Sequence, residues 1–251
     1  MSTVDSAAHV ARQIEAGNDW YTSSQFEWAR QPGVWRIYAG RERFFAECIK
    51  CQRLRSPDPL RVLDAGCGDG YWLSRLSRLP GMRLTGVDYN PLRVARAKQA
   101  APGARVLVGD LTALAPGEVF DVILFSQVIE HVVDDVGLLR SLRRFVDPKG
   151  CLILGTPNEG SPRHQRTIQE LGSSFKTDHV HFYTESEITG KIGDAGFTID
   201  RVYREVFHIG NDRLYYGLNA RVWGFALLTF MTRLYPSECS DFYFECRPTV
   251  A

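Results

Sequence analysis

The stretch that decides the fold runs Val62-Leu63-Asp64-Ala65-Gly66-Cys67-Gly68-Asp69-Gly70 and leads into the segment Tyr71–Leu79. Its apolar start predicts a buried strand, its three glycines permit a tight turn, and the residues after it have helical character. A strand, a glycine turn and a helix in this order form the ligand-binding unit of parallel α/β folds, in which the backbone approaches the ligand closely. We therefore expect a ligand site at this turn.

Around the turn, short apolar runs rich in β-branched residues alternate with helical segments from about residue 60 to residue 200, which predicts βαβ units and a parallel sheet. We expect strands at Arg61–Asp64, Arg83–Asp88, Ala104–Val108, Phe120–Phe125, Cys151–Gly155, Thr198–Val206 and Asp241–Cys246. Asn90 can cap a helix that has Pro91 at its first position. Thr184 and Glu187 have the spacing of a capping box, and Gly196 suits the end of that helix.

Two segments flank the predicted sheet. Residues 1–58 include a helix expected over Arg41–Leu54, and they either lie across the ligand site as a lid or pack on the sheet as an aromatic layer. Their aromatic side chains are Trp20, Tyr21, Phe26, Trp28, Trp35 and Tyr38. Residues 59–251 form the main domain, with an insertion at 207–239. Its apolar run Val222–Met231 is shorter than the roughly 20 residues that span a bilayer. Core or dimer packing is its favoured role, and covering an apolar substrate or resting on a membrane are the alternatives.

The composition argues against several functions. The chain has 30 basic and 29 acidic residues, so no global field recruits nucleic acid. The first twenty residues contain charged side chains and no continuous apolar run, unlike a signal peptide, so we expect a cytoplasmic protein. The six cysteines do not resemble a disulfide framework. Cys48 and Cys51 have the spacing of half a zinc site, but no second pair follows, so structural zinc is not expected.

The charges beside the glycine turn favour a cationic ligand. Asp64 and Asp69 flank the turn and would repel a pyrophosphate, and Tyr71 stands where a nicotinamide-binding turn has its third glycine. S-adenosylmethionine (SAM) carries a sulfonium and an ammonium group and no phosphate, so nearby carboxylates stabilise it. We therefore predict SAM as the cofactor. The residues expected to contact it at the turn are Asp64, Gly66, Cys67 and Gly68.

Further candidate cofactor residues lie at the ends of the following strands. Asp88 ends the second strand about twenty residues after the glycine turn, where a carboxylate can accept hydrogen bonds from both ribose hydroxyls. Asp110, directly after the third strand, is placed to accept from the adenine amino group, with the Leu111 N–H near the ring. Tyr89 and Gln127 complete the predicted cofactor contacts.

With these residues in place, the chain resembles the class I SAM-dependent methyltransferases, and within them the branch of the ubiquinone-biosynthesis O-methyltransferases. The resemblance covers roughly residues 60–200. It rests on Val62–Gly70, Gly86-Val87-Asp88, Gly109-Asp110-Leu111, Phe120–His131, Pro148-Lys149-Gly150 and Gly155-Thr156-Pro157-Asn158. It implies an α/β fold with a single Rossmann-like, seven-stranded, mostly parallel sheet, an antiparallel last strand and helices on both faces. The residues outside this range match no pattern that we can name, and they choose the substrate.

Three histidines are candidates for a catalytic base. Methyl transfer from a sulfonium is an in-line displacement, so the protein mainly aligns the nucleophile and excludes water, and a hydroxyl acceptor also benefits from a base. His131 follows the fourth strand at the carboxyl edge of the sheet, where open α/β folds place ligands. His179 and His181 end a polar loop that starts at Thr156 and can close over that edge. A surface or structurally hydrogen-bonded ring is the alternative for each.

The run Gln127-Val128-Ile129-Glu130-His131 raises the question of a metal. Some members of the resembled branch, and plant small-RNA 2′-O-methyltransferases, carry a Glu-x-x-Glu-His run that binds a divalent metal. Here Gln127 replaces the first glutamate and removes an anionic ligand, although Glu130, His131 and a later histidine could still form a site. A divalent metal is therefore an alternative that the sequence does not favour, and no metal ligand is assigned.

The sequence thus predicts an enzyme that transfers a methyl group from SAM to a hydroxyl of a small molecule, such as a phenol, a sugar or a secondary metabolite. Methylation of nitrogen or carbon, a SAM-binding module without catalysis and a nicotinamide-dependent oxidoreductase are the competing hypotheses. A small-molecule substrate is the expected partner, with a homodimer as an option and nucleic acid not expected.

Overall fold

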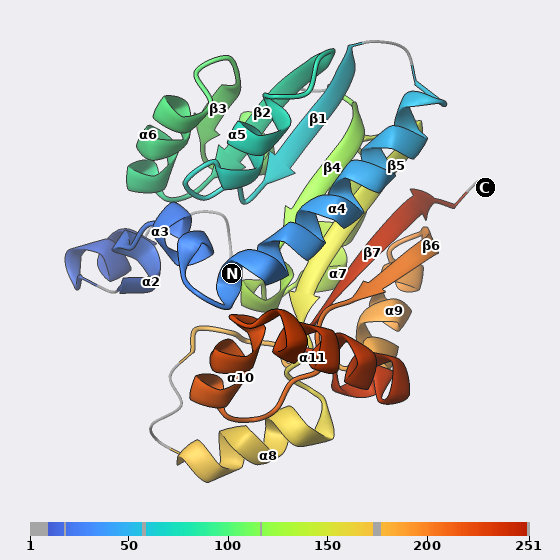
Figure 1. Ribbon diagram of the computed structural model, residues 1–251. Coiled ribbons are helices and arrows are strands. Elements are labelled where there is room, and N and C mark those ends of the chain that lie inside the picture. The colour runs from blue at the N-terminus through green and yellow to red at the C-terminus, as the bar shows by residue number, and fades with distance from the viewer. Residues whose placement is uncertain (1–9, 18, 57–58, 116, 173–176, 250–251) are drawn as a thin grey trace.

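A computed structural model describes residues 10–17, 19–56, 59–115, 117–172 and 177–249 (Figure 1). Its strands are β1 Leu60–Ala65, β2 Met82–Asp88, β3 Arg105–Val108, β4 Phe120–Ser126, β5 Val146–Pro157, β6 Phe197–Arg204 and β7 Asp241–Pro248. They form one sheet in the order β3-β2-β1-β4-β5-β7-β6. β1 to β5 pair in parallel, and β7 lies antiparallel between β5 and β6. The predicted α/β class and the mostly parallel sheet with an antiparallel last strand are confirmed.

Every predicted strand is present, and β5 departs most from its predicted bounds. It begins at Val146 rather than Cys151. Val146 pairs with Phe120 and Cys151 pairs with Val122, so the register shifts between these two pairs. The run Pro148-Lys149-Gly150 therefore lies within an irregular part of the strand. Proline and glycine together usually mark a turn, which is why the sequence hid this extension.

Helices cover both faces of the sheet, as predicted. Val62 belongs to a core cluster that also contains Phe45, Trp72 and Ala97, whereas its neighbour Leu63 belongs to a second cluster. Successive strand residues point to opposite faces, so both faces are buried. One face is covered by α4 Val34–Arg53, α5 Tyr71–Leu76 and α6 Pro91–Ala100, and the other by α7 Asp135–Arg143 and α9 Glu185–Asp194.

The predicted helix ends hold at three positions and shift at two others. The Asn90 side chain accepts from the N–H groups of Leu92 and Arg93 at 3.0 and 3.1 Å, and Thr184 forms the complete capping box with Glu187. Gly196 ends α9 with φ 83°. However, α4 starts at Val34 rather than Arg41, and α5 stops at Leu76 rather than Leu79.

The early start of α4 follows from its buried face. Val34, Ile37 and Tyr38 lie on the face that continues to Phe45, at helical spacing. Gly33 precedes them with φ 88°, where an added Cβ would lie 2.3 Å from the Tyr216 carbonyl oxygen. The first turns of α4 are thus an aromatic layer that packs on the sheet. The two shorter helices before it, α2 Asp19–Thr22 and α3 Gln25–Arg30, lie beside α6 and α5 instead (Figure 1). Residues 1–9 of that segment are outside the described residues.

The segments after β5 and β6 contain more helix than predicted. α8 Pro162–Leu171 lies where we expected a polar loop from Thr156 to Tyr183. Its signals were present, since Ser161 caps it and Pro162 stands at its first position. The chain at 173–176 of this loop is outside the described residues. The insertion 207–239 forms α10 Asp212–Asn219 and α11 Val222–Leu234, and α8, α10 and α11 lie together beyond the carboxyl edge of the sheet (Figure 1).

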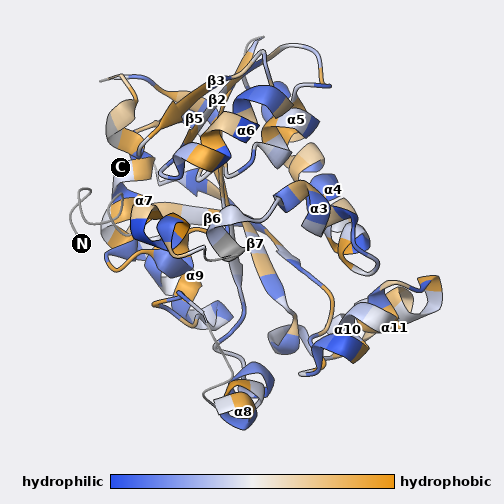
Figure 2. Cartoon of the chain, turned by 90° about the vertical axis from the view of Figure 1, so that its left-hand side faces the viewer, coloured by the Kyte–Doolittle hydropathy of each residue, from blue (hydrophilic) through white to orange (hydrophobic). Residues whose placement is uncertain are grey.

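The apolar helix α11 is buried on one side only. Gly224, Leu228 and Thr232 are buried, whereas Trp223 and Phe230 are 61% and 53% exposed. Figure 2 shows α11 with α10 at the edge of the molecule. The predicted core packing therefore holds for one face of the helix only. The run is apolar on all sides, so its other face leaves large apolar side chains exposed. Among the described helices, none is long and apolar enough to cross a membrane.

Candidate cofactor and active site

The glycine turn is packed too closely for side chains. Gly66, Gly68 and Gly70 have φ values of 79°, 51° and 78°, which favour glycine. A Cβ on Gly66 would lie 2.3 Å from the Val128 side chain, and one on Gly70 would lie 2.8 Å from Ala97. The turn therefore touches both the chain after β4 and helix α6. The contact of Gly66 with Val128 joins the predicted cofactor residues to the segment that carries the predicted active-site residues.

Asp88 is fixed at the end of β2 by backbone groups. Its Oδ2 accepts from the Gly68 N–H at 2.8 Å, and its Oδ1 accepts from the Asn90 N–H at 2.8 Å. Burial raises the pKa of Asp88, and these two N–H groups act in the opposite direction. An ionised carboxylate has about four acceptor positions, so both oxygens keep capacity for ribose hydroxyls. The arrangement fits the role predicted for Asp88.

Asp64 is a buried carboxylate with no ion pair among the described residues. The residue is 2% exposed, and its Oδ2 has no hydrogen-bond partner among the residues that the structure describes. Burial, with the charge of Asp88, raises the pKa of Asp64 to about 7. Such a group is costly unless a cation or donor pairs with it. This unpartnered oxygen beside the glycine turn fits the ammonium group of SAM.

Asp69 and Cys67, at the glycine turn, are both buried. Asp69 Oδ2 accepts from the Gln25 N–H at 2.8 Å, and Arg96 lies 3.6 Å from its Oδ1, so Asp69 anchors the N-terminal segment rather than standing open to a ligand. Cys67 is buried, and its sulfur would lie 2.9 Å from a Cβ on Gly86. A contact of Cys67 with the cofactor would therefore come from its backbone.

The residues predicted to contact the cofactor after β2 and β3 are joined to each other. The Tyr89 hydroxyl donates to Asp110 Oδ2 at 2.9 Å, which links the chain after β2 to the chain after β3. Leu111 begins the short helix η1 Leu111–Ala113 and is buried. Tyr89, Asp110 and Leu111 thus adjoin the carboxyl ends of the strands next to Asp88, as the sequence predicted.

Gln127 has an unusual backbone at the end of β4. Its φ of 58° is the one positive value for a non-glycine residue in the described chain. The left-handed region costs such a residue about 1–2 kcal/mol. Its N–H donates to the Gly155 carbonyl at 2.8 Å, and its side-chain amide lies 3.5 Å from the Tyr243 hydroxyl. Strain of this kind often marks a functional position. No local pattern pointed to Tyr243, because it lies on β7, 116 positions from Gln127.

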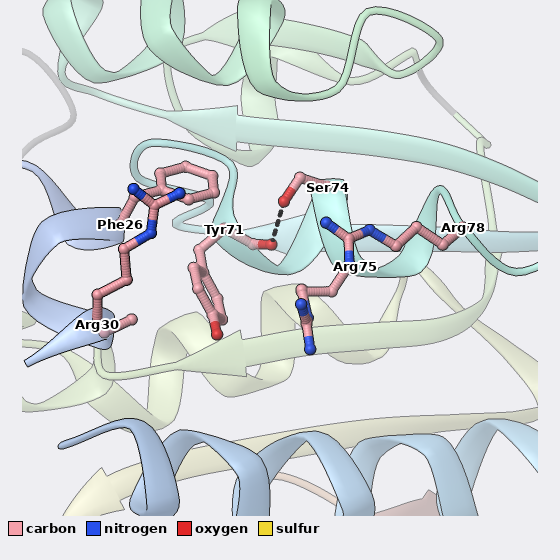
Figure 3. A pocket seen from close by; sticks show the side chains of 7 residues that line it. Phe26, Arg30, Tyr71, Ser74, Arg75 and Arg78 are labelled. Carbon is pink, nitrogen blue, oxygen red and sulfur yellow. Dashed lines mark hydrogen bonds between the residues drawn. The ribbon is translucent and has the colours of Figure 1, made fainter. Parts of the chain in front are cut away.

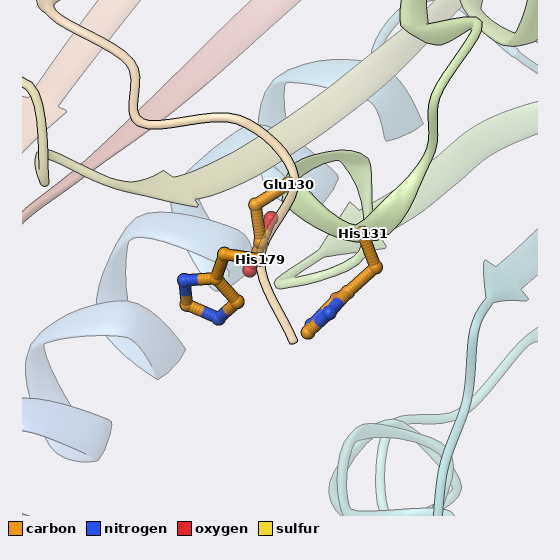
Figure 4. Close-up of side chains that lie close together, drawn as sticks. All are labelled: Glu130, His131 and His179. Atoms are coloured by element: carbon orange, nitrogen blue, oxygen red, sulfur yellow. The ribbon is translucent and has the colours of Figure 1, made fainter. Parts of the chain in front are cut away.

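Glu130, His131 and His179 come together beside this strand end (Figure 4). Glu130 and His131 lie on the short helix η2 Ile129–His131, and His179 comes from the segment after α8. Their ligand atoms all lie within 4.8 Å of one another. Glu130 is 1% exposed and accepts from the Thr156 hydroxyl at 3.2 Å, and burial raises its pKa. Such a group of side chains could serve acid–base chemistry or hold a cation.

The neighbours of the two histidines include carboxylates that sequence reasoning missed. His131 Nδ1 lies 3.3 Å from Asp178 Oδ1, and His179 Nδ1 lies 2.5 Å from Glu159 Oε2. Burial lowers the pKa of His131, but the hydrogen bond to Asp178 and the charge of Glu130 outweigh it and raise that pKa. No local motif identifies Asp178 or Glu159, since each contact depends on how the segment after β5 folds back.

His181 is engaged in backbone contacts. Its Nε2 lies 3.0 Å from the Val132 carbonyl oxygen and 3.3 Å from that of Val133, and its ring stacks on Tyr183 with centroids 5.3 Å apart. The rings of His131 and His179 lie 4.7 Å apart. The structure therefore brings two of the three candidate bases together and surrounds the third with structural contacts.

Two cavities are lined by none of Glu130, His131 and His179. One, of about 170 Å³, is formed between α3 and α5 by Phe26, Arg30, Tyr71 and Arg75 with their neighbours (Figure 3). The Arg75 guanidinium there is paired with Glu42 at 2.6 Å. The other, of about 450 Å³, lies between the starts of α8 and α9. Neither is lined by the residues predicted to bind the cofactor.

Comparisons with known proteins agree with this geometry. The family model described as a methyltransferase domain matches residues 38–202. The ubiquinone biosynthesis O-methyltransferase of Cereibacter sphaeroides is 32% identical over 217 residues, covering 80% of this chain and 86% of that protein. The protein of the same name from Methylobacterium nodulans is 35% identical over 161 residues, covering 58% of this chain and 64% of that protein. This chain thus spans just under two thirds of some curated relatives that it matches.

A solved structure shows the same fold. The putative sarcosine dimethylglycine methyltransferase from Galdieria sulphuraria superposes with a TM-score of 0.61 at 14% identity, covering 83% of this chain and 85% of that one. At this identity the likeness concerns the fold alone.

Proposed function

Because this chain belongs to the SAM-dependent methyltransferases, we propose that it transfers the methyl group of SAM to a hydroxyl of a small molecule. The observation that supports this most directly is the position of His131. It follows β4 three residues after Val128, whose side chain lies against the glycine turn, and it lies beside Glu130 and His179. A histidine there can take the proton of an acceptor hydroxyl.

The proposed cofactor contacts follow the charges and donors of the site. Asp64 Oδ2, which has no hydrogen-bond partner among the described residues, accepts from the SAM ammonium group, and Asp88 accepts from the ribose hydroxyls. Asp110 and the Leu111 N–H hold the adenine. When bound, SAM supplies a methyl group on a positively charged sulfur. The chain's own part is to hold the acceptor in line with that methyl group, exclude water and remove the acceptor's proton.

The N-terminal segment fits the lid that the sequence suggested. Its backbone is held beside the cofactor residues, since Asn90 donates to the Tyr21 carbonyl at 2.9 Å and Asp69 accepts from Gln25. We assign α2 and α3 to the covering of the cofactor and the first turns of α4 to the sheet. The acceptor then reaches the site from the side of α8 and α10.

The first experiment is calorimetric titration of the protein with S-adenosylhomocysteine, the demethylated product, and with reduced nicotinamide cofactor as the control. Binding of the homocysteine compound alone supports the cofactor site. Methyl transfer from labelled SAM is then screened over phenols and sugars, with amines as the contrasting acceptors. Transfer to hydroxyls supports the proposal, and transfer only to nitrogen or carbon replaces it. Binding with no transfer to any acceptor favours a module without catalysis.

A second candidate is methyl transfer assisted by a divalent cation. The closeness of Glu130, His131 and His179 favours it, and the amide of Gln127 counts against it, because hard cations prefer anionic oxygen ligands. If His131 acts as a base without a metal, exhaustive treatment with a chelator leaves turnover unchanged. A loss that added magnesium restores, and that zinc or calcium restores differently, would favour the cation.

A further inference from the structure

The Tyr21 side chain joins two parts of the site that lie far apart in the sequence. Its backbone belongs to the cofactor side, since Asn90 donates to the Tyr21 carbonyl at 2.9 Å, and Arg96 donates to the next carbonyl, that of Thr22, at 2.8 Å. Its hydroxyl donates to Asp178 Oδ2 at 2.5 Å. The two partners in this last contact are 157 positions apart.

Asp178 belongs to the opposite, acceptor side. The segment that carries it is fixed to η2, because the N–H groups of Val180 and His181 both donate to the Glu130 carbonyl, at 2.8 and 3.2 Å. Tyr21 therefore connects the residues around Asp88 and the glycine turn with the helix that carries His131.

The carboxylate of Asp178 is shared between a phenol and an imidazole. One oxygen accepts from Tyr21, and the other lies 3.3 Å from His131 Nδ1. Both side chains are only partly exposed, Asp178 by 28% and His131 by 35%. A carboxylate at Nδ1 holds the proton on that nitrogen, so the lone pair of the neutral ring lies on Nε2. A histidine held in this way presents a basic nitrogen in a fixed direction.

From this geometry we propose that Asp178 is the positioning residue of His131, and that Tyr21 makes this orientation depend on the N-terminal segment being closed over the cofactor. The inference rests on the proposed function in one respect, the use of His131 as the base. It adds two residues, neither of which touches the reacting atoms. It also gives the lid a chemical role, because an open lid would leave Asp178 without its phenolic donor.

The direct test reads the imidazole itself. Nitrogen NMR of histidine-labelled protein, with bound S-adenosylhomocysteine and at a pH well above the pKa of the ring, distinguishes a proton on Nδ1 from one on Nε2. The His131 signal is the one that His131→Ala removes. We expect the Nδ1–H form in the unaltered protein, a mixture or the opposite form in Asp178→Asn, and a partial shift in Tyr21→Phe. The same Nδ1–H form in all variants would overturn the inference.

Tyr89→Phe is the matched control, because it also removes a phenol that donates to a carboxylate at this edge of the sheet. It should leave the His131 form unchanged and weaken the binding of S-adenosylhomocysteine. Asp178→Asn should leave that binding within about twofold, which also verifies that the variant is folded. A change of the His131 form in Tyr89→Phe equal to that in Tyr21→Phe would show a general disturbance and contradict the proposal.

Turnover with the acceptor selected in the screen separates this inference from the proposed function. Asp178→Asn should lower kcat by roughly 10- to 100-fold with little change in KM, below the 100- to 10,000-fold range of a base itself. Tyr21→Phe should add nothing further in the Asp178→Asn background, since it acts through Asp178. If His131→Ala keeps full activity, the base proposal fails. If His131→Ala is inactive and Asp178→Asn is not impaired, only the positioning role fails.

Discussion

The cofactor side and the acceptor side of the site are built in different ways. On the cofactor side, Gly68 and Asp88 are 20 positions apart and Tyr89 and Asp110 are 21 apart, about one βα unit in each case. Between the two sides, Gln127 meets Tyr243 across 116 positions, and on the acceptor side Asp178 meets Tyr21 across 157. Short separations produce motifs that can be recognised in a sequence. Long separations produce contacts that only the complete fold brings together.

The largest expected effect tests whether chemistry belongs to the acceptor side alone. His131→Ala should lower turnover by roughly 100- to 10,000-fold, the range of general-base catalysis, and leave the affinity for S-adenosylhomocysteine nearly unchanged. His181→Ala is the control, because its ring contacts backbone carbonyls. The His181→Ala variant should show lower thermal stability rather than lower turnover. Equal turnover in both variants would remove histidine base catalysis from the account.

Asp88 tests the converse, that affinity belongs to the cofactor side. Asp88→Ala should weaken binding of S-adenosylhomocysteine by about 1.5–3 kcal/mol, since it removes hydrogen bonds to a charged group. Asp88→Asn keeps the shape of the side chain and should lose less. Calorimetry gives both affinities, and thermal unfolding shows whether the Gly68 and Asn90 contacts have been disturbed. An unchanged affinity would end the ribose assignment.

Asp64 adds a pH dependence to the cofactor side. Its pKa, raised by burial to about 7, means that it ionises only above that pH in the free protein. SAM binding should therefore weaken as the pH falls through 7, by up to about tenfold per pH unit, and should release a proton there. Calorimetry in buffers of different ionisation enthalpy measures that proton. Asp64→Asn should bind with no such slope, and an equal slope in that variant would assign the proton elsewhere.

The raised pKa of Asp64 affects the stability of the cofactor-free protein in the opposite direction to its effect on SAM binding. Between about pH 4 and pH 7 the folded chain keeps a proton on Asp64 that the unfolded chain has released. Asp64 therefore lowers the free energy of unfolding of the cofactor-free protein as the pH rises across this range. Bound SAM should reduce that loss.

The smallest effect concerns the strained residue between the two sides. Gln127→Gly removes the left-handed strain and should stabilise the cofactor-free protein by about 0.5–1 kcal/mol, after the greater freedom of glycine in the unfolded chain is taken into account. Thermal unfolding measures this change. Gln127→Ala keeps the strain and should not be stabilised. If both variants are destabilised alike, the side chain stabilises the fold and the strain has no functional meaning.

The division between short and long separations also explains what could be predicted from the sequence. The individual strands, the glycine turn and the Asn90 and Thr184 caps depend on residues close in the chain, and all were predicted. α8 was missed although Ser161 and Pro162 mark its start, because the surrounding residues are polar and no buried face supports it. Asp178 was missed for a different reason, since nothing local distinguishes it from any other surface aspartate.

Strand β7 has a consequence for how the chain reaches its fold. Its residues 241–248 lie between β5 and β6, and Leu152 pairs with Cys246. β6 joins the sheet only through β7, so it has no partner strand until these late residues are present. During synthesis, β5 and β6 would each expose an unpaired edge, which invites association with other chains. Closing the sheet should thus be a slow, non-local step, and it is the point at which a molecular chaperone would matter most.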